Sequence, residues 1–163
     1  MINIRKSEIE DLPRIEQIYA HARRQMKING NPHQWKDSEP SIDKIINDIN
    51  NKNHYIIMEN GRICGVFSLI FGEDPTYKVI EGKWLNDLPY VTIHRVASNN
   101  TVKGILETSI SYGFEHCNTV RVDTHEENSI MRHLLERLGF TYCGIIHLLN
   151  GEPRLAYQKT INR

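Results

Sequence analysis

The chain has 163 residues, enough for one domain whose core needs neither disulfides nor a structural metal. Its 20 Lys and Arg balance its 20 Asp and Glu, so overall charge would not recruit nucleic acid or an anionic membrane. The N-terminus has no apolar signal core, and the longest apolar run, residues 63–71, is too short to cross a bilayer. Three cysteines without a C-x-x-C spacing are typical of a cytoplasmic protein with free thiols.

A strand and a long helix are predicted at the N-terminus. Residues 2–5 alternate apolar and polar side chains, and Ser7 with Glu10 predicts a capping box that opens a helix ending near Lys27. The apolar face of this helix repeats at spacings of three and four: Leu12, Ile15, Tyr19, Ala22 and Met26.

A loop separates this helix from the next one. Residues 29–41 are dense in turn formers and carry Trp35 among polar neighbours. Ser41 is a suitable N-cap for a second helix over residues 42–51.

The middle of the chain predicts a hairpin and then an irregular excursion. Asn60-Gly61 separates two strand-like runs, residues 54–59 and 62–71, and this dipeptide is the strongest short hairpin signal in the chain. Residues 72–89 show neither helical nor strand periodicity, but their large apolar side chains indicate a packed excursion rather than a linker: Tyr77, Ile80 and Trp84.

Strands and helices alternate in the C-terminal half. We expect a strand at 90–97, a helix at 103–117, a strand at 119–124, a helix at 128–138 and two closing strands around Asn150-Gly151. A strand-helix-strand crossover such as 90–124 pairs its two strands in parallel. The predicted fold is therefore mixed α/β in an otherwise largely antiparallel sheet.

The polar loop after the strand ending at Ala97 has the features of an anion site. It leads to Lys103-Gly104 at a helix start, where unpaired amides and the helix dipole favour a phosphate. Taken alone, the same residues favour ordinary helix initiation over phosphate binding.

Several longer segments resemble the GNAT acetyltransferase superfamily. They are IRKSEIEDLPRIEQIY, NPHQW, GKWLNDLPYVTIHRVA, VDTHEEN and LGFTYCGI, and the resemblance covers essentially the whole chain as one domain, residues 1–163. It implies a mixed, mostly antiparallel sheet of about seven strands flanked by four helices, with parallel central fourth and fifth strands that splay apart. It also implies acetyl-CoA as co-substrate without a metal, and a small-molecule or peptide amine as acceptor, while a homodimer stays open.

The resemblance assigns the coenzyme contacts. The family's phosphate-loop signature falls on residues 101–106, where only Gly104 matches, although the backbone amides that a phosphate needs are present throughout. Val96 and Ala97 would offer main-chain groups to the pantetheine, and Asn128, also a good helix N-cap, matches the family's coenzyme-contacting Asn. The implied coenzyme-binding residues are Val96, Ala97, Thr101, Val102, Lys103, Gly104, Ile105, Leu106 and Asn128.

The catalytic groups follow less directly, because Leu135 occupies the position of the family's proton-donating Tyr. Strand alternation places His94 on one face with Tyr90 and Thr92, and Arg95 on the other face with Val91 and Ile93. With an intrinsic pKa near neutrality, His94 is a candidate general base, although a histidine in a central strand is often a hydrogen-bonded core residue. Arg95 could be an ion-pair partner or a ligand for an acceptor carboxylate. Proton donors that remain open are Tyr142, Tyr157 and Tyr90, of which we favour Tyr142.

Trp35, Trp84 and Tyr90 are the candidate acceptor-binding residues, because the family places their segments beside the acceptor; core anchoring is the alternative for each Trp. A metal site is not expected, since the spacing of Asp123, His125, Glu126 and His133 matches no ligand pattern. The sequence thus predicts an acetyl-CoA-dependent N-acetyltransferase acting on a primary amine in a ternary complex. The alternative is a non-catalytic acyl-CoA-binding regulatory module of the same fold.

Overall fold

A computed structural model describes residues 1–36 and 38–163. The helical elements are η1 (Ile9–Asp11), α1 (Leu12–Ile28), α2 (Ile42–Asn50), η2 (Pro75–Tyr77), α3 (Ile105–His116) and α4 (Ser129–Arg137). The strands are β1 (Ile2–Lys6), β2 (His54–Glu59), β3 (Arg62–Phe71), β4 (Glu81–Gly82), β5 (Val91–Ser98), β6 (Thr119–Thr124), β7 (Thr141–His147) and β8 (Pro153–Thr160).

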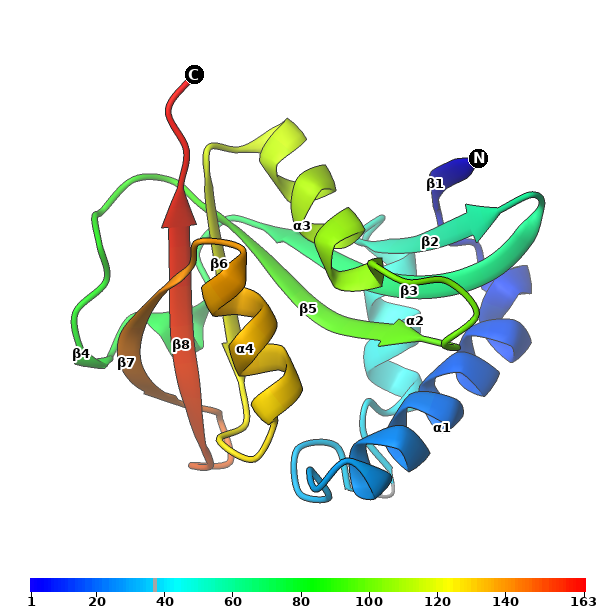
Figure 1. The fold of residues 1–163 in the computed structure, drawn as a ribbon, viewed down its shortest axis with the longest axis horizontal. Coiled ribbons are helices and arrows are strands. Elements are labelled where there is room, and N and C mark those ends of the chain that lie inside the picture. The colour runs from blue at the N-terminus through cyan, green and yellow to red at the C-terminus, as the bar shows by residue number, and fades with distance from the viewer. Residues whose placement is uncertain (37) are drawn as a thin grey trace.

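All described strands form one sheet in the order β1-β2-β3-β5-β6-β8-β7-β4 (Figure 1). Every neighbouring pair is antiparallel except the central β5 and β6, which are parallel. The predicted mixed fold with a parallel central pair is confirmed. The sheet has eight strands rather than about seven, because the excursion after β3 contributes the two-residue β4 to the edge beside β7.

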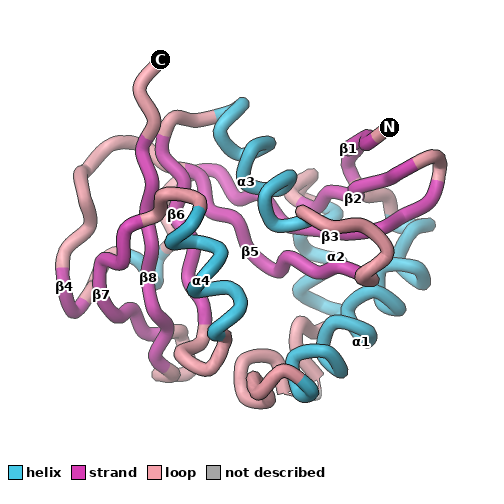
Figure 2. The backbone as a smooth tube through the Cα atoms, in the orientation of Figure 1, coloured by secondary structure: helices cyan, strands magenta, loops and turns pink. Residues whose placement is uncertain are grey.

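Helices cover both faces of the sheet (Figure 2). Helices α3 and α4 close one core, to which Phe67, Leu69 and Ile93 belong. Helices α1 and α2 close the other core, which includes Ile15, Tyr19 and Trp35. Periodic apolar residues predict both layers because each amphipathic helix must bury one face against the sheet.

The β2–β3 hairpin confirms the Asn60-Gly61 signal. Both turn residues have positive φ, 52° for Asn60 and 79° for Gly61. A tight two-residue hairpin requires this conformation at both positions, and Asn and Gly adopt it at little cost.

The predicted capping box at Ser7 is wrong. The backbone N–H of Ser7 continues the sheet ladder by donating to the His54 carbonyl at 2.9 Å, so Ser7 does not initiate the helix. Its hydroxyl turns inward and lies 2.7 Å from His54 Nδ1. The local turn instead uses Asp11, whose carboxylate accepts from the Glu8 backbone N–H at 2.8 Å.

Candidate active site

The two central strands separate partway along their length. β5 and β6 pair only at Val91 with Val120 and Thr92 with Arg121, and beyond these positions they diverge (Figure 1). The resemblance to GNAT proteins implied such a divergence between 90–97 and 119–124. The gap leaves main-chain groups of β5 without a strand partner on one side, and two cavities open there.

A bulge in β5 changes which side chains face this gap. His94 pairs with Ser68 and Ala97 with Val66, so the single residue Phe67 lies opposite both Arg95 and Val96. Arg95 has a φ of 53°. The prediction that Arg95 faces away from His94 is wrong, because the extra residue interrupts the alternation and turns the Arg95 side chain toward α2.

Arg95 forms a partly buried ion pair at this bulge. Its Nε donates to Asp48 Oδ2 at 2.8 Å and its Nη2 to Asp48 Oδ1 at 3.1 Å. The Ser68 hydroxyl also donates to Asp48, at 2.6 Å. Of the two roles left open for Arg95, the structure shows the ion pair.

A cavity of about 530 Å³, here called the loop cavity, lies at the ends of α3 and α4. Eight of the predicted coenzyme-binding residues line it, and Thr101 is absent from its lining. The eight are Val96, Ala97, Val102, Lys103, Gly104, Ile105, Leu106 and Asn128.

Several residues that line the loop cavity have unpaired backbone amides. Within the described residues, the N–H groups of 102–106 donate no hydrogen bond to protein acceptors, as the start of a helix requires. Gly104 is the N-cap of α3 with a φ of 80°, a left-handed conformation that favours glycine. The loop before it is held by Asn99, whose Oδ1 accepts from the Thr101 N–H at 3.1 Å and hydroxyl at 2.6 Å. Unpaired amides at a helix start are the groups that an anion would need.

Asn128 is the N-cap of α4, as the sequence predicts. Its Oδ1 accepts from the Met131 backbone N–H at 3.1 Å, and its Nδ2 donates to Gln34 Oε1 at 3.2 Å. The side chain thus links the start of α4 to the segment that follows α1 while it lines the loop cavity.

A second cavity of about 310 Å³, the strand cavity, lies on the other side of the gap. Its wall combines Trp35, His94 and Arg95 with Asp123 of β6 and Arg154 of β8. Three apolar side chains line both cavities and mark where they meet: Met26, Val96 and Met131.

His94 is the histidine that lines the strand cavity. Its Nε2 lies 3.1 Å from Asp74 Oδ2 and its Nδ1 lies 3.8 Å from Asp123 Oδ2. Since an ionised carboxylate only accepts, Nε2 carries a hydrogen in this contact, and in the neutral ring the lone pair is then on Nδ1. The His94 side chain is 19% exposed and lines the strand cavity.

Both carboxylates beside His94, those of Asp74 and Asp123, also accept hydrogen bonds from other residues. Burial opposes ionisation of Asp74, but hydrogen bonds from His94 and Thr76 outweigh it and lower the pKa of Asp74 to about 2. Asp123 Oδ2 accepts from the Tyr77 hydroxyl at 2.6 Å. Burial, together with the charge of Asp123, raises the pKa of Tyr77 well above its usual value and keeps this donor protonated.

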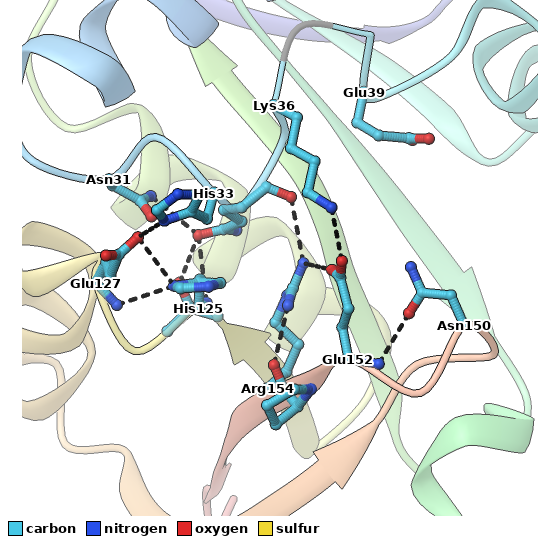
Figure 3. A network of polar contacts seen from close by, with 12 residues as sticks. Asn31, His33, Lys36, Glu39, His125, Glu127, Asn150, Glu152 and Arg154 are labelled. Carbon is cyan, nitrogen blue, oxygen red and sulfur yellow. Dashed lines mark hydrogen bonds and ion pairs between the residues drawn. The ribbon is translucent and has the colours of Figure 1, made fainter.

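The segment after α1, residues 31–36 and here called the bridging segment, spans the gap (Figure 3). The Gln34 carboxamide oxygen lies within 3.3 Å of donors on Asn31, Thr124, His125 and Asn128. Lys36 Nζ lies 2.8 Å from Glu152, which in turn contacts Arg154 at 3.4 Å. These contacts join the segment after α1 to β6 and β8, and they close one side of the strand cavity.

The remaining predicted site residues have separate locations. Trp35 is buried and lines the strand cavity, against Tyr19 at a ring distance of 5.6 Å. Trp84 and Tyr90 belong to a third apolar cluster and both contact the Arg121 guanidinium, each ring centroid lying 4.0 Å away. Tyr142 is 50% exposed beside Tyr157. In the described part of the chain, none of these last four residues lines either cavity.

Sequence reasoning missed Asp74, and it considered Asp123 only as a possible metal ligand. Asp74 lies in the excursion after β3, where Asp-Pro-Thr is a turn signal and Asp74 Oδ1 caps η2 by accepting from the Thr76 N–H at 2.8 Å. That signal predicts the turn, but not the histidine 20 residues away that the same carboxylate contacts.

Among residues 1–36 and 38–163, no cluster of three or more His, Cys, Asp or Glu is placed to hold a metal ion. No helix in these ranges is long and apolar enough to span a membrane.

Comparisons with known proteins agree with this architecture. The acetyltransferase (GNAT) domain family matches residues 2–141. A GNAT-family acetyltransferase from Streptococcus agalactiae has 34% sequence identity and a TM-score of 0.88, with 99% of this chain and 96% of that chain covered. The chain belongs to the GNAT acetyltransferase family. No curated protein sequence matches it.

Two more distant solved structures share the fold. A putative acetyltransferase from Staphylococcus aureus has 20% identity and a TM-score of 0.71, with 98% of this chain and 99% of that chain covered. YncA from Salmonella typhimurium, a putative acetyltransferase solved with its cofactor acetyl-CoA, has 17% identity and a TM-score of 0.62, covering 99% and 95%.

Proposed function

We propose that this protein is an N-acetyltransferase that moves the acetyl group of acetyl-CoA to the primary amine of a small-molecule or peptide acceptor. The observation that carries the proposal is the meeting of two cavities at the β5–β6 gap. One cavity offers free amides for phosphate, and the other holds a histidine with a free ring nitrogen.

The loop cavity would take acetyl-CoA. The pyrophosphate would accept hydrogen bonds from the backbone amides of 102–106, and the pantetheine arm would run along Val96 and Ala97 toward the gap. The side chains of Lys103 and Asn128 also line this cavity. YncA from Salmonella typhimurium, which shares the fold, was solved with acetyl-CoA as its cofactor, and this supports the choice of coenzyme.

The strand cavity would take the acceptor amine and remove its proton. An alkylamine with a pKa near 10.4 is neutral in only about one molecule in a thousand at pH 7, so a base is useful. His94 Nδ1 would accept an amine proton, Asp74 would hold the ring through Nε2–H, and Asp123 would accept a second amine hydrogen bond. The amine nitrogen then bonds to the thioester carbonyl carbon while the carbon–sulfur bond breaks, and the second proton that the nitrogen loses in becoming an amide passes to water.

The thiolate that leaves needs a proton, and His94 would return the one it accepted, directly or through water. The three side chains shared by both cavities, Met26, Val96 and Met131, have no proton to give. Leu135, which stands where the family has its proton-donating Tyr, is fully buried in the core. Tyr142 has no part in this mechanism, since it lines neither cavity.

The missing Tyr favours one alternative, a non-catalytic acyl-CoA-binding module. Steady release of CoA thiol separates the two functions. We expect acetyl-CoA turnover with at least one amine in a panel of amino acids, polyamines, aminoglycosides and peptides, and loss of that turnover in His94→Gln. Tight acetyl-CoA binding with no thiol release across the panel would instead establish the binding module.

A further inference from the structure

A chain of buried hydrogen bonds leads from the start of the sheet to the β5 bulge. The Tyr19 hydroxyl donates to the Arg95 carbonyl at 2.8 Å. Its oxygen also lies 3.0 Å from His54 Nε2, and His54 Nδ1 lies 2.7 Å from the Ser7 hydroxyl. Ser7, Tyr19 and His54 are all buried, with exposed fractions of 5%, 2% and 0%.

The donor and the acceptor of each hydrogen bond in this series can be assigned. Tyr19 has one hydroxyl hydrogen, which goes to the Arg95 carbonyl, so Tyr19 can only accept from His54. His54 therefore carries its hydrogen on Nε2 and accepts from the Ser7 hydroxyl at Nδ1. Burial lowers the pKa of His54 to about 4, which keeps the ring neutral and able to accept at neutral pH.

This series of hydrogen bonds ends at the one residue of β5 with a positive φ. Arg95 is the bulged residue, with a φ of 53°, and a non-glycine residue holds such a conformation only when its surroundings fix it. Its side chain is fixed by Asp48 and its carbonyl by Tyr19. His94 precedes it and Val96, which lines both cavities, follows it.

We propose that Tyr19, oriented by His54 and Ser7, is a positioning residue for acetyl transfer that acts through the Arg95 carbonyl. Its hydroxyl fixes the bulge, and the bulge sets the course of the β5 backbone from His94 to Val96 along the β5–β6 gap. The catalytic part of this inference rests on the proposed function of His94. The geometric part does not, because it concerns the backbone of residues 94–96.

Tyr19→Phe tests the inference, because it removes the hydroxyl and keeps the ring against Trp35. We expect kcat for CoA-thiol release to fall about tenfold to a hundredfold, while the Kd for acetyl-CoA changes by less than about twofold. Tyr55→Phe is the matched control. Tyr55 is as buried as Tyr19, but it stacks on Phe67 in the opposite core. The kcat of the Tyr55→Phe variant should therefore equal that of the wild type.

A double-mutant cycle asks whether Tyr19 acts through His94. In a His94→Gln background, Tyr19→Phe should lower the residual kcat by less than about threefold, because the group it positions has already been removed. The same fold loss in both backgrounds, or an unchanged kcat in Tyr19→Phe alone, would overturn the proposal.

A second readout does not need turnover. Backbone amide resonances of His94, Arg95 and Val96 should shift in Tyr19→Phe and stay in place in Tyr55→Phe, and unshifted resonances would overturn the proposal. A wild-type protein that turns over no amine refutes the proposed function, yet these resonances still decide whether Tyr19 holds the bulge. If Tyr19→Phe does not fold, Ser7→Ala replaces it: we expect the same resonances to shift and kcat to fall about threefold to tenfold, and no change in either would refute the proposal.

Discussion

Asp74 holds His94 by its Nε2 hydrogen, with the carboxylate oxygen 3.1 Å from the ring nitrogen. In the neutral ring this contact leaves Nδ1 as the basic atom, and Nδ1 lies 3.8 Å from Asp123 Oδ2. The pair thereby converts a strand histidine into a group with a defined acceptor nitrogen, on which the catalytic proposal depends.

His94→Gln should preserve the fold and acetyl-CoA affinity and lower kcat by about 10²–10⁴, the usual contribution of general acid–base catalysis. The acidic limb of the kcat/KM profile should also move. Because an acceptor amine produces its own alkaline-rising limb, the comparison needs two acceptors of different pKa. A variant with near-wild-type kcat and the same acidic limb for both acceptors would make His94 a structural residue.

Asp74→Asn should lower kcat without changing the Kd for acetyl-CoA, because an amide can hydrogen-bond to either tautomer of His94 and no longer fixes the hydrogen on Nε2. Acetyl-CoA titration monitored by calorimetry supplies the Kd, and thiol release supplies kcat. Glu73→Gln is a control for the loss of one negative charge at the neighbouring exposed position. Equal kcat values for Asp74→Asn and the wild type would contradict the orienting role.

The same variant should change the acid stability of the protein. The pKa of Asp74 falls from its ordinary 3.8 to about 2 on folding, so its ionised form stabilises the fold above about pH 4, and this contribution is lost as the pH falls toward 2. The wild type should therefore be more stable than Asp74→Asn at pH 5, with the difference shrinking toward pH 2. Urea unfolding at several pH values measures it, and a difference independent of pH would rule out this linkage.

Gly104→Glu should weaken acetyl-CoA binding by bringing a negative charge to the free amides at the start of α3. Because Gly104 has a φ of 80°, any side chain adds backbone strain, so Gly104→Ala is the matched control for strain alone. A Cβ here would meet only Glu107 Oε2 at 3.8 Å, so there is room for the methyl group. Equal Kd values for the two folded variants would remove this loop from the coenzyme site.

Trp35→Phe should raise the KM for the acceptor and leave the KM for acetyl-CoA nearly unchanged, because Trp35 lines the strand cavity. Trp84→Phe is the comparison: Trp84 packs on Arg121 away from both linings, so both KM values should stay within about twofold. A rise in the acetyl-CoA KM with Trp35→Phe would place this residue on the coenzyme side instead.

Local chemistry made part of this protein predictable from its sequence. Asn60-Gly61 specified the hairpin because both residues tolerate positive φ, and Asn128 specified the start of α4 because its side chain caps an amide three residues later. The free amides after the polar loop follow from the position of a helix start, whatever the rest of the fold does.

Only the tertiary structure decided what surrounds the histidines. Asp74 reaches His94 from 20 residues away, and Ser7 reaches His54 from 47, so no local pattern records either contact. Strand alternation predicted the direction of His94 but failed one residue later, because the bulge at Arg95 is held by Asp48 and Tyr19 from two helices. Periodicity describes a regular strand, whereas a bulge depends on long-range partners that stabilise its strained residue.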